Sequence, residues 1–124
     1  MLAETREARA EDALFYFDRG VDKFSAGDYS GSISDFSKAI EIDSTFAGSY
    51  VNRGLAKSQL KDYSGALSDY DKAIELDPNY ANAYFNRSLT KKQLKDLSGA
   101  RSDYDKAVQL DPKFADIKND SKWY

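Results

Sequence analysis

Apolar side chains recur along the chain at the spacing of helix faces, without any stretch in which polar and apolar residues alternate. In residues 47–80, for example, Tyr50 and Gly54 are followed by Ala66 and Tyr70. This spacing indicates amphipathic helices rather than strands. The pattern is interrupted by Gly-containing segments such as residues 62–65 and by Asp-Pro pairs, because proline is tolerated at the start of a helix but not in its interior. We expect six helices, over residues 13–26, 29–42, 47–60, 63–76, 81–94 and 97–110.

The helices are organised in repeats, because a shift of 34 residues aligns the sequence with itself. Residues 47–80 and 81–114 are identical at 22 of 34 positions, and residues 13–46 and 47–80 are identical at 16. Three repeats leave a segment before them, residues 1–12, which we expect to extend the first helix. The remaining segment, residues 115–124, is expected to cap the last repeat. The chain is thus expected to form one domain, residues 1–124.

The repeat resembles the tetratricopeptide repeat, a 34-residue helix–turn–helix family with the pattern W-x2-L-G-x2-Y, A-x3-F and P. In the second repeat Tyr50 stands where the family has its Trp, and Gly54 takes the place of the Gly. Ala66 and Tyr70 form the A-x3-F pair, and Pro78 closes the unit. The resemblance implies an all-α, right-handed α-solenoid, in which each repeat buries a face that it cannot bury alone. It also implies that the first helices line a concave peptide-binding groove.

Thirteen residues are candidates for this groove. Apolar side chains on the first helices form a stripe separate from the Tyr and Gly packing positions, and amides lie beside it. The candidates are Leu14, Phe17, Val21 and Phe24 in the first repeat, Val51, Asn52, Leu55 and Gln59 in the second, and Asn82, Phe85, Asn86, Leu89 and Gln93 in the third. The resemblance implies that Asn52 and Asn86 bind the main chain of a peptide, since an amide both donates and accepts hydrogen bonds.

Two interpretations of the stripe are open at this stage. In the first, the ligand contacts one connected, partly exposed strip, so truncating Phe17 or Phe85 weakens binding and leaves the fold largely intact. The strip consists of Phe17, Val21, Val51, Leu55, Phe85 and Leu89. In the second, these side chains pack one first helix against the next and the asparagines are solvated. We expect ligand contact, because the Tyr and Gly positions already supply a separate packing stripe.

Charged residues also recur at the 34-residue spacing. Basic columns lie on the first helices, at Arg19, Arg53, Arg87 and at Lys23, Lys57, Lys91, and an acidic column lies on the second helices, at Asp35, Asp69 and Asp103. One interpretation is a cationic stripe that faces a ligand, and the other is pairing between the arginines and the aspartates. We expect pairing, since repeated charges are usually paired or solvated.

Composition narrows the possible functions. The 124 residues include no Cys and no His, which excludes structural zinc sites of Cys and His and catalysis by a histidine-activated nucleophile. The balance of 18 basic and 21 acidic residues argues against nucleic acid as a partner, and no apolar run reaches the roughly 20 residues of a membrane span. We therefore expect a protein that is not an enzyme and has no cofactor, metal or membrane partner. The absence of Cys fits a reducing compartment, so we expect a cytoplasmic protein, and the alternative is an exported protein whose leader has been removed.

The expected function is a protein-interaction module that binds a short apolar or amphipathic segment of a partner protein. The alternative is a structural or self-associating unit of a larger assembly. Family members that bind the acidic C-terminal tails of heat-shock chaperones carry a characteristic set of five Lys, Arg and Asn residues. The equivalent positions here are Phe17, Val21, Asn52, Asn82 and Asn86. Only Asn52 matches, so we expect no binding of such tails.

Overall fold

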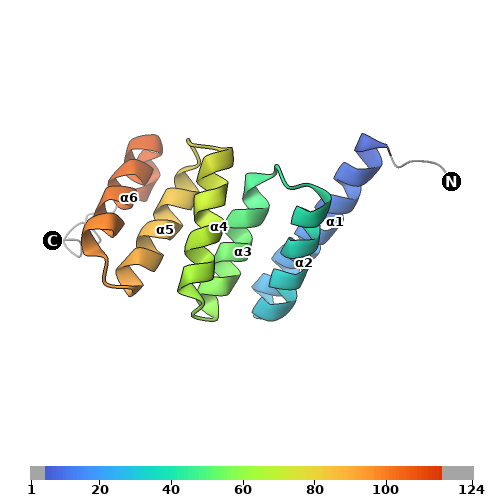
Figure 1. Ribbon diagram of the computed structural model, residues 1–124, viewed down its shortest axis with the longest axis horizontal. Helices are drawn as coiled ribbons and strands as arrows, with labels where there is room; N and C mark the ends of the chain where they lie inside the picture. The colour runs from blue at the N-terminus through green and yellow to red at the C-terminus, as the bar shows by residue number, and fades with distance from the viewer. Residues whose placement is uncertain (1–4, 116–124) are drawn as a thin grey trace.

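The computed structural model describes residues 5–115, which form six α-helices and one short 3-10 helix, with no strand in this part of the chain (Figure 1). The helices are α1 (Arg6–Ser25), α2 (Tyr29–Ile42), α3 (Ala47–Gln59), α4 (Tyr63–Leu76), α5 (Ala81–Gln93) and α6 (Leu97–Leu110), followed by η1 (Pro112–Phe114). The predicted all-α class is confirmed, and α1 includes residues 6–12 of the expected N-terminal extension. The expected C-terminal cap lies, apart from Ala115, outside the described residues.

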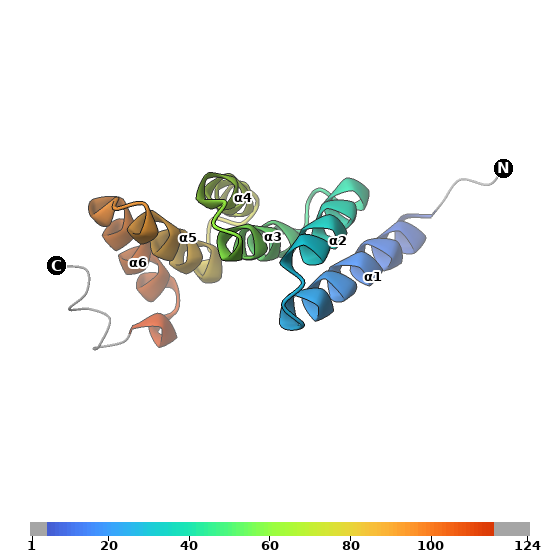
Figure 2. The same cartoon turned by 90° about the horizontal axis from the view of Figure 1, so that it is seen from below.

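Consecutive helices pack side by side into an α-solenoid. Helices α1 and α2, α3 and α4, and α5 and α6 form hairpins, and each hairpin packs against the next through α2 with α3 and α4 with α5. The turns within the repeats lie at one edge of the molecule, and the connections between repeats lie at the opposite edge (Figures 1 and 2). The first helices also contact one another, α1 with α3 and α3 with α5. Their shared side is therefore available as one surface.

The second helix of each repeat begins with the same N-cap. The Asp62 carboxylate accepts a hydrogen bond from the backbone N–H of Gly65 at 3.0 Å, and Asp28 and Asp96 accept equivalent bonds in the other two repeats. An acidic N-cap satisfies a backbone donor that has no partner within the helix and favours the positive end of the helix dipole. These caps explain why the predicted starts of α2, α4 and α6 agree with the structure.

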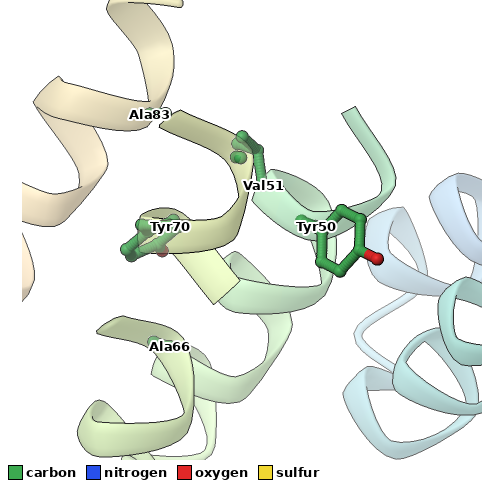
Figure 3. Packing of buried hydrophobic residues seen from close by; sticks show 6 residues of the cluster. Tyr50, Val51, Ala66, Tyr70 and Ala83 are labelled. Carbon is green, nitrogen blue, oxygen red and sulfur yellow. The ribbon is translucent and has the colours of Figure 1, made fainter. Parts of the chain in front are cut away.

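The core lies where neighbouring repeats meet. In the middle of the molecule it contains buried Tyr50, Val51, Ala66, Tyr70, Ala73 and Ala83. Figure 3 shows that Tyr50 and Val51, although adjacent on α3, extend in different directions. Gly54 permits close packing of α3 on α4, since a Cβ atom there would lie 2.7 Å from the Tyr70 ring. The buried side chains thus connect α3 with α4 and α5, and the partly buried Ile40 of α2 packs against them.

The predicted pairing of the arginines with the aspartates is confirmed. Asp69 is buried, and Arg53 donates two hydrogen bonds to its carboxylate, from Nε at 2.9 Å and from Nη2 at 2.7 Å. Lys57 Nζ lies 3.1 Å from the same carboxylate. The arrangement recurs with Arg19, Lys23 and Asp35 in the first repeat and with Arg87, Lys91 and Asp103 in the third. The sequence did not predict the role of the lysines, and the interpretation as a free cationic stripe was wrong.

Two of the arginines also connect neighbouring repeats. Nη1 of Arg53 donates to the hydroxyl of Ser37 on α2 at 3.2 Å, and Nη1 of Arg87 donates to Asp71 on α4 at 2.9 Å. Each arginine therefore contacts the second helix of its own repeat and that of the preceding repeat. A bidentate guanidinium suits this role, because its planar fork has donors left over after pairing with one carboxylate.

Candidate functional site

The candidate site lies on the side of α1, α3 and α5 that carries the thirteen predicted groove residues, here called the inner face. Four of the thirteen meet in one small cavity, to which α1 contributes Val21 and Phe24 and α3 contributes Asn52 and Leu55. The buried ring of Phe36 on α2 completes the lining. This cavity, the α1–α3 pocket, has a volume of about 90 Å³ and a mostly apolar wall with one amide.

Asn52 is the polar group of this pocket. Its side chain is half-buried and makes no hydrogen bond or ion pair with any other residue of the described chain. An amide in an apolar environment loses free energy when its donors and acceptor stay unpaired, by about 1–3 kcal/mol for a fully buried group. A ligand that offers a main-chain N–H and C=O therefore recovers hydrogen bonds that the protein itself does not supply.

Two more predicted residues, Leu14 and Phe17, line a larger cavity towards the N-terminal end of α1. Its volume is about 210 Å³, and its other lining residues are Ala10, Ala13, Ala39, Asp43, Phe46 and Ser49. Asp43 is the only carboxylate in this lining, and hydrogen bonds from the hydroxyl and backbone N–H of Thr45 lower its pKa. The cavity is thus an apolar recess with an ionised carboxylate at its wall.

Of the remaining predicted groove residues, some line a third cavity and others line none of the three cavities. Gln59, Leu89 and Gln93 line a wide polar cavity of about 530 Å³ at the far end of α3 and α5, together with Ser58, Tyr63, Lys92 and Lys95. Asn82, Phe85 and Asn86 line none of these three cavities. Asn82 is exposed, and Asn86 is half-buried. The structure therefore brings together the centre of the predicted groove but not all of its third repeat.

The expected continuous apolar strip is wrong at its centre, because Val51 is only 2% exposed and belongs to the core. The two phenylalanines beside it also pack inward. The ring centroid of Phe17 lies 5.7 Å from that of buried Phe36, and the centroid of Phe85 lies 6.5 Å from that of buried Tyr104. The expectation that Phe17 and Phe85 lie outside the packing of the fold was therefore wrong. Val21, Leu14 and Leu89 are the exposed apolar members of the stripe.

An aromatic residue at the last position of each repeat forms a column that was not predicted from the sequence. Phe46 meets Phe17 edge to face at 5.2 Å, and Phe114 stacks on Phe85 at 4.8 Å. Tyr80, at the same position in the second repeat, packs against the central core. The signal was present, since the aromatic recurs at the 34-residue spacing. Phe17 and Phe85 on the inner face therefore contribute to the packing of the fold, because each contacts the aromatic ring at the end of its own repeat.

The charged side chains near the inner face already form ion pairs within the protein. The hydrogen bond from Arg19 lowers the pKa of Asp35, and the same bond raises the pKa of Arg19. Burial alone raises the pKa of Asp103, but the hydrogen bonds from Arg87 and Lys91 outweigh it and lower that pKa. None of the residues that line the α1–α3 pocket is charged. The pocket can therefore offer apolar contact and amide hydrogen bonds.

Comparison with known proteins supports the resemblance stated from the sequence. Residues 47–80 and residues 69–102 each match a family model described as tetratricopeptide repeat. A search of curated proteins found no significant match. None of the described helices has the length and apolar character needed to cross a bilayer.

Three solved structures show the similarity in fold. The first TPR domain of Spaghetti (RPAP3), bound to the HSP90 peptide SRMEEVD, is 26% identical, with a TM-score of 0.85 over 92% of this chain and 89% of that chain. The second TPR domain of Spaghetti, bound to the same peptide, is 29% identical, with a TM-score of 0.81 over 85% and 99%. The second TPR domain of human RPAP3, in complex with the HSP70 peptide SGPTIEEVD, is 26% identical, with a TM-score of 0.83 over 93% and 94%.

Proposed function

Because this chain is a tetratricopeptide repeat protein and a peptide-binding protein-interaction module, we propose that its inner face binds a short apolar or amphipathic segment of a partner protein. The partner segment lies across α1 and α3, with one aliphatic side chain in the α1–α3 pocket. Its main chain exchanges hydrogen bonds with the amide of Asn52. Leu14 and Leu89, both exposed, extend the apolar contact on either side.

The observation that carries this proposal is the α1–α3 pocket itself. It combines an apolar wall, a volume of about 90 Å³ and an amide without an internal partner. A cavity of that volume has room for more than one water molecule, and its apolar wall suits a small aliphatic side chain such as Val or Leu. Burying such a side chain contributes about 1.5–3 kcal/mol, and the amide adds specificity for an extended main chain.

The partner segment differs in charge from the peptides held by the similar domains. The peptides in those structures, SRMEEVD and SGPTIEEVD, end in acidic residues. This chain has Phe17 and Val21 where tail-binding members carry Lys and Asn, and it has Asn82 and Asn86 where they carry Lys and Arg. Each missing charge-assisted hydrogen bond is worth about 1.5–3 kcal/mol. We therefore propose that apolar contacts select the partner and that acidic chaperone tails are not ligands.

The test is a selection of displayed random peptides on the wild-type chain, followed by fluorescence anisotropy with the enriched peptides. We expect dissociation constants near the micromolar range, about −8 kcal/mol. The variant Asn52→Ala should weaken binding about tenfold and leave the melting temperature unchanged, since Asn52 has no internal partner. The matched control Asn79→Ala, in the exposed connection between α4 and α5, should change neither. Full binding by the Asn52→Ala variant would place the peptide elsewhere.

The alternative function is a structural or self-associating unit. It predicts an apparent mass that rises with protein concentration in light scattering, whereas peptide binding by a monomer predicts a constant mass. We further propose that the module is not catalytic, binds no nucleic acid and works in the cytoplasm. The absence of His and Cys and the net charge of −3 support the first two of these statements.

A further inference from the structure

The N-terminal end of the solenoid leaves one side of α1 uncovered. In α3 and α5 the equivalent side is covered by the second helix of the preceding repeat, and Ser49 and Ala83 are there 1% and 0% exposed. At the equivalent position of α1 the phenyl ring of Phe15 is 54% exposed. The repeat geometry therefore has a place for a helix on this side of α1, and no described part of the chain fills it.

This side of α1, here called the α1 outer face, has a composition of its own. It consists of six exposed residues within about one third of the helix circumference, namely Glu11, Leu14, Phe15, Asp18, Val21 and Asp22. Three of these residues are apolar and three are carboxylates. None of the three carboxylates makes a side-chain hydrogen bond or ion pair with the rest of the described chain.

The arginine that follows Asp18 on the same helix does not neutralise these carboxylates. Arg19 borders the α1 outer face, but its guanidinium donates two hydrogen bonds to Asp35 on α2, at 2.9 and 2.8 Å. The same guanidinium lies 5.3 Å from the centre of the Phe15 ring, which it helps to hold in place. The face thus combines exposed apolar surface with uncompensated negative charge.

From this combination we propose that a basic amphipathic helix of a partner protein docks on the α1 outer face. A helix fits beside Phe15 and Asp22, because the residues at the equivalent positions of α3 and α5 are buried under the preceding second helix, namely Ser49, Ala56, Ala83 and Thr90. The helix carries Lys or Arg because three unpaired carboxylates lie between Phe15 on one side of the face and Leu14 and Val21 on the other, and complementary charge steers and selects partners. The bulk of Phe15, at a position where Ser49 and Ala83 permit close packing, disfavours a further copy of the repeat. This surface is distinct from the α1–α3 pocket, although Leu14 and Val21 lie at the border of both.

The test uses a 14-residue model helix of Leu and Lys, LKKLLKLLKKLLKL, and its Leu and Glu counterpart as probes. We expect the basic peptide to bind the wild-type chain and the acidic peptide not to bind it. The affinity for the basic peptide should fall at least tenfold between about 25 and 300 mM salt. Backbone amide shifts in an NMR titration should concentrate in α1. The variant Asn52→Ala should bind the basic peptide normally, which separates this result from that of the inner face.

Matched charge variants decide whether the binding is specific. The triple variant Glu11→Gln/Asp18→Asn/Asp22→Asn should weaken binding about tenfold or more, and Phe15→Ala about tenfold. The control variant Glu41→Gln/Glu75→Gln/Asp105→Asn removes the same charge from exposed positions on α2, α4 and α6 and should change binding less than about twofold. Circular dichroism verifies that each variant is folded. Equal weakening by both triple variants, shifts centred on another surface, or self-association of the chain on α1 would overturn the proposal.

Discussion

At the scale of single residues, the turns within the repeats hold two lysines in a costly backbone conformation. Lys61 and Lys95 have φ angles of 66° and 68°, in the left-handed region, and Gly27 occupies the equivalent turn of the first repeat at 83°. Glycine adopts this region without steric penalty, whereas a Cβ atom there costs about 1–2 kcal/mol. The turn geometry explains the conformation, and nothing in the structure explains why lysine stands there.

Replacing Lys61 by glycine should therefore stabilise the protein. We expect Lys61→Gly to raise the free energy of unfolding by about 0.5–1 kcal/mol, which is the relief of backbone strain less the added entropy of the unfolded chain. Urea denaturation measures the change. The control Lys61→Ala keeps the Cβ atom and should give no gain. A destabilised glycine variant would mean that the lysine side chain contributes more than the strain costs.

The inner-face phenylalanines give a second prediction at this scale. Because Phe85 packs between Tyr104 and Phe114, Phe85→Ala should lower the free energy of unfolding by about 2–3 kcal/mol. Asn86→Ala, at the next position of the same helix, should change it by less than about 0.5 kcal/mol, since the Asn86 side chain has no described internal partner. If the two variants were equally stable, the Phe85 side chain would not contribute to the packing of the fold.

At the scale of elements, the clusters of Arg, Lys and Asp join the two helices of each repeat. Asp103 is buried and paired with both Arg87 and Lys91. Removing this carboxylate leaves two partly buried cations with fewer partners, and Asp103→Ala should cost about 2–4 kcal/mol. The exposed neighbour Asp105 provides the control, and Asp105→Ala should cost less than about 0.5 kcal/mol. A small effect at Asp103 in denaturation experiments would show that the clusters do not hold the hairpins.

The same carboxylates set the pH dependence of stability. The pKa values of Asp35 and Asp103 are lowered from the ordinary value of 3.8, so folding favours their ionised forms. Their contribution is fully present above the ordinary pKa and is lost as the pH falls through the lowered values. We expect constant stability between about pH 5 and 7, since the chain has no His, and a decline below about pH 4.

Denaturation midpoints measured across this range test the pH dependence. An Asp35→Asn/Asp103→Asn variant should be less stable at neutral pH and should lose less of its remaining stability on acidification. A midpoint that already falls between pH 7 and 5 would contradict the assignment, because no side chain named in it titrates there.

The elements were predictable from the sequence to a greater degree than the site. The helices follow from apolar spacing and from N-caps such as Asp62, which are local signals. The exposure of a side chain, by contrast, depends on which other helices pack against it and not on the local sequence alone. Val51 and Leu55 lie on the same predicted stripe, yet Val51 is buried in the core, whereas Leu55 is only partly buried against that core and lines the α1–α3 pocket. The lysine in each charge cluster was missed for the same reason, since its place beside the aspartate depends on how the helices cross.

At the scale of the whole molecule, the solenoid has different surfaces on its inner side and at its N-terminal end. Stacking buries the sides of α3 and α5 that face a preceding repeat, and no described helix covers the corresponding side of α1. The inner face is open along α1, α3 and α5. An elongated repeat protein thus presents two separate candidate surfaces for partners, one apolar with amides and one apolar with carboxylates.

The most direct test of the central claim is an NMR titration of the labelled chain with a peptide selected on the wild type. Peptide binding on the inner face predicts that the largest amide shifts fall at Val21, Phe24, Asn52 and Leu55, with little change on the outward sides of α2, α4 and α6. Shifts confined to α2, α4 and α6, with the α1–α3 pocket unchanged at saturation, would contradict it.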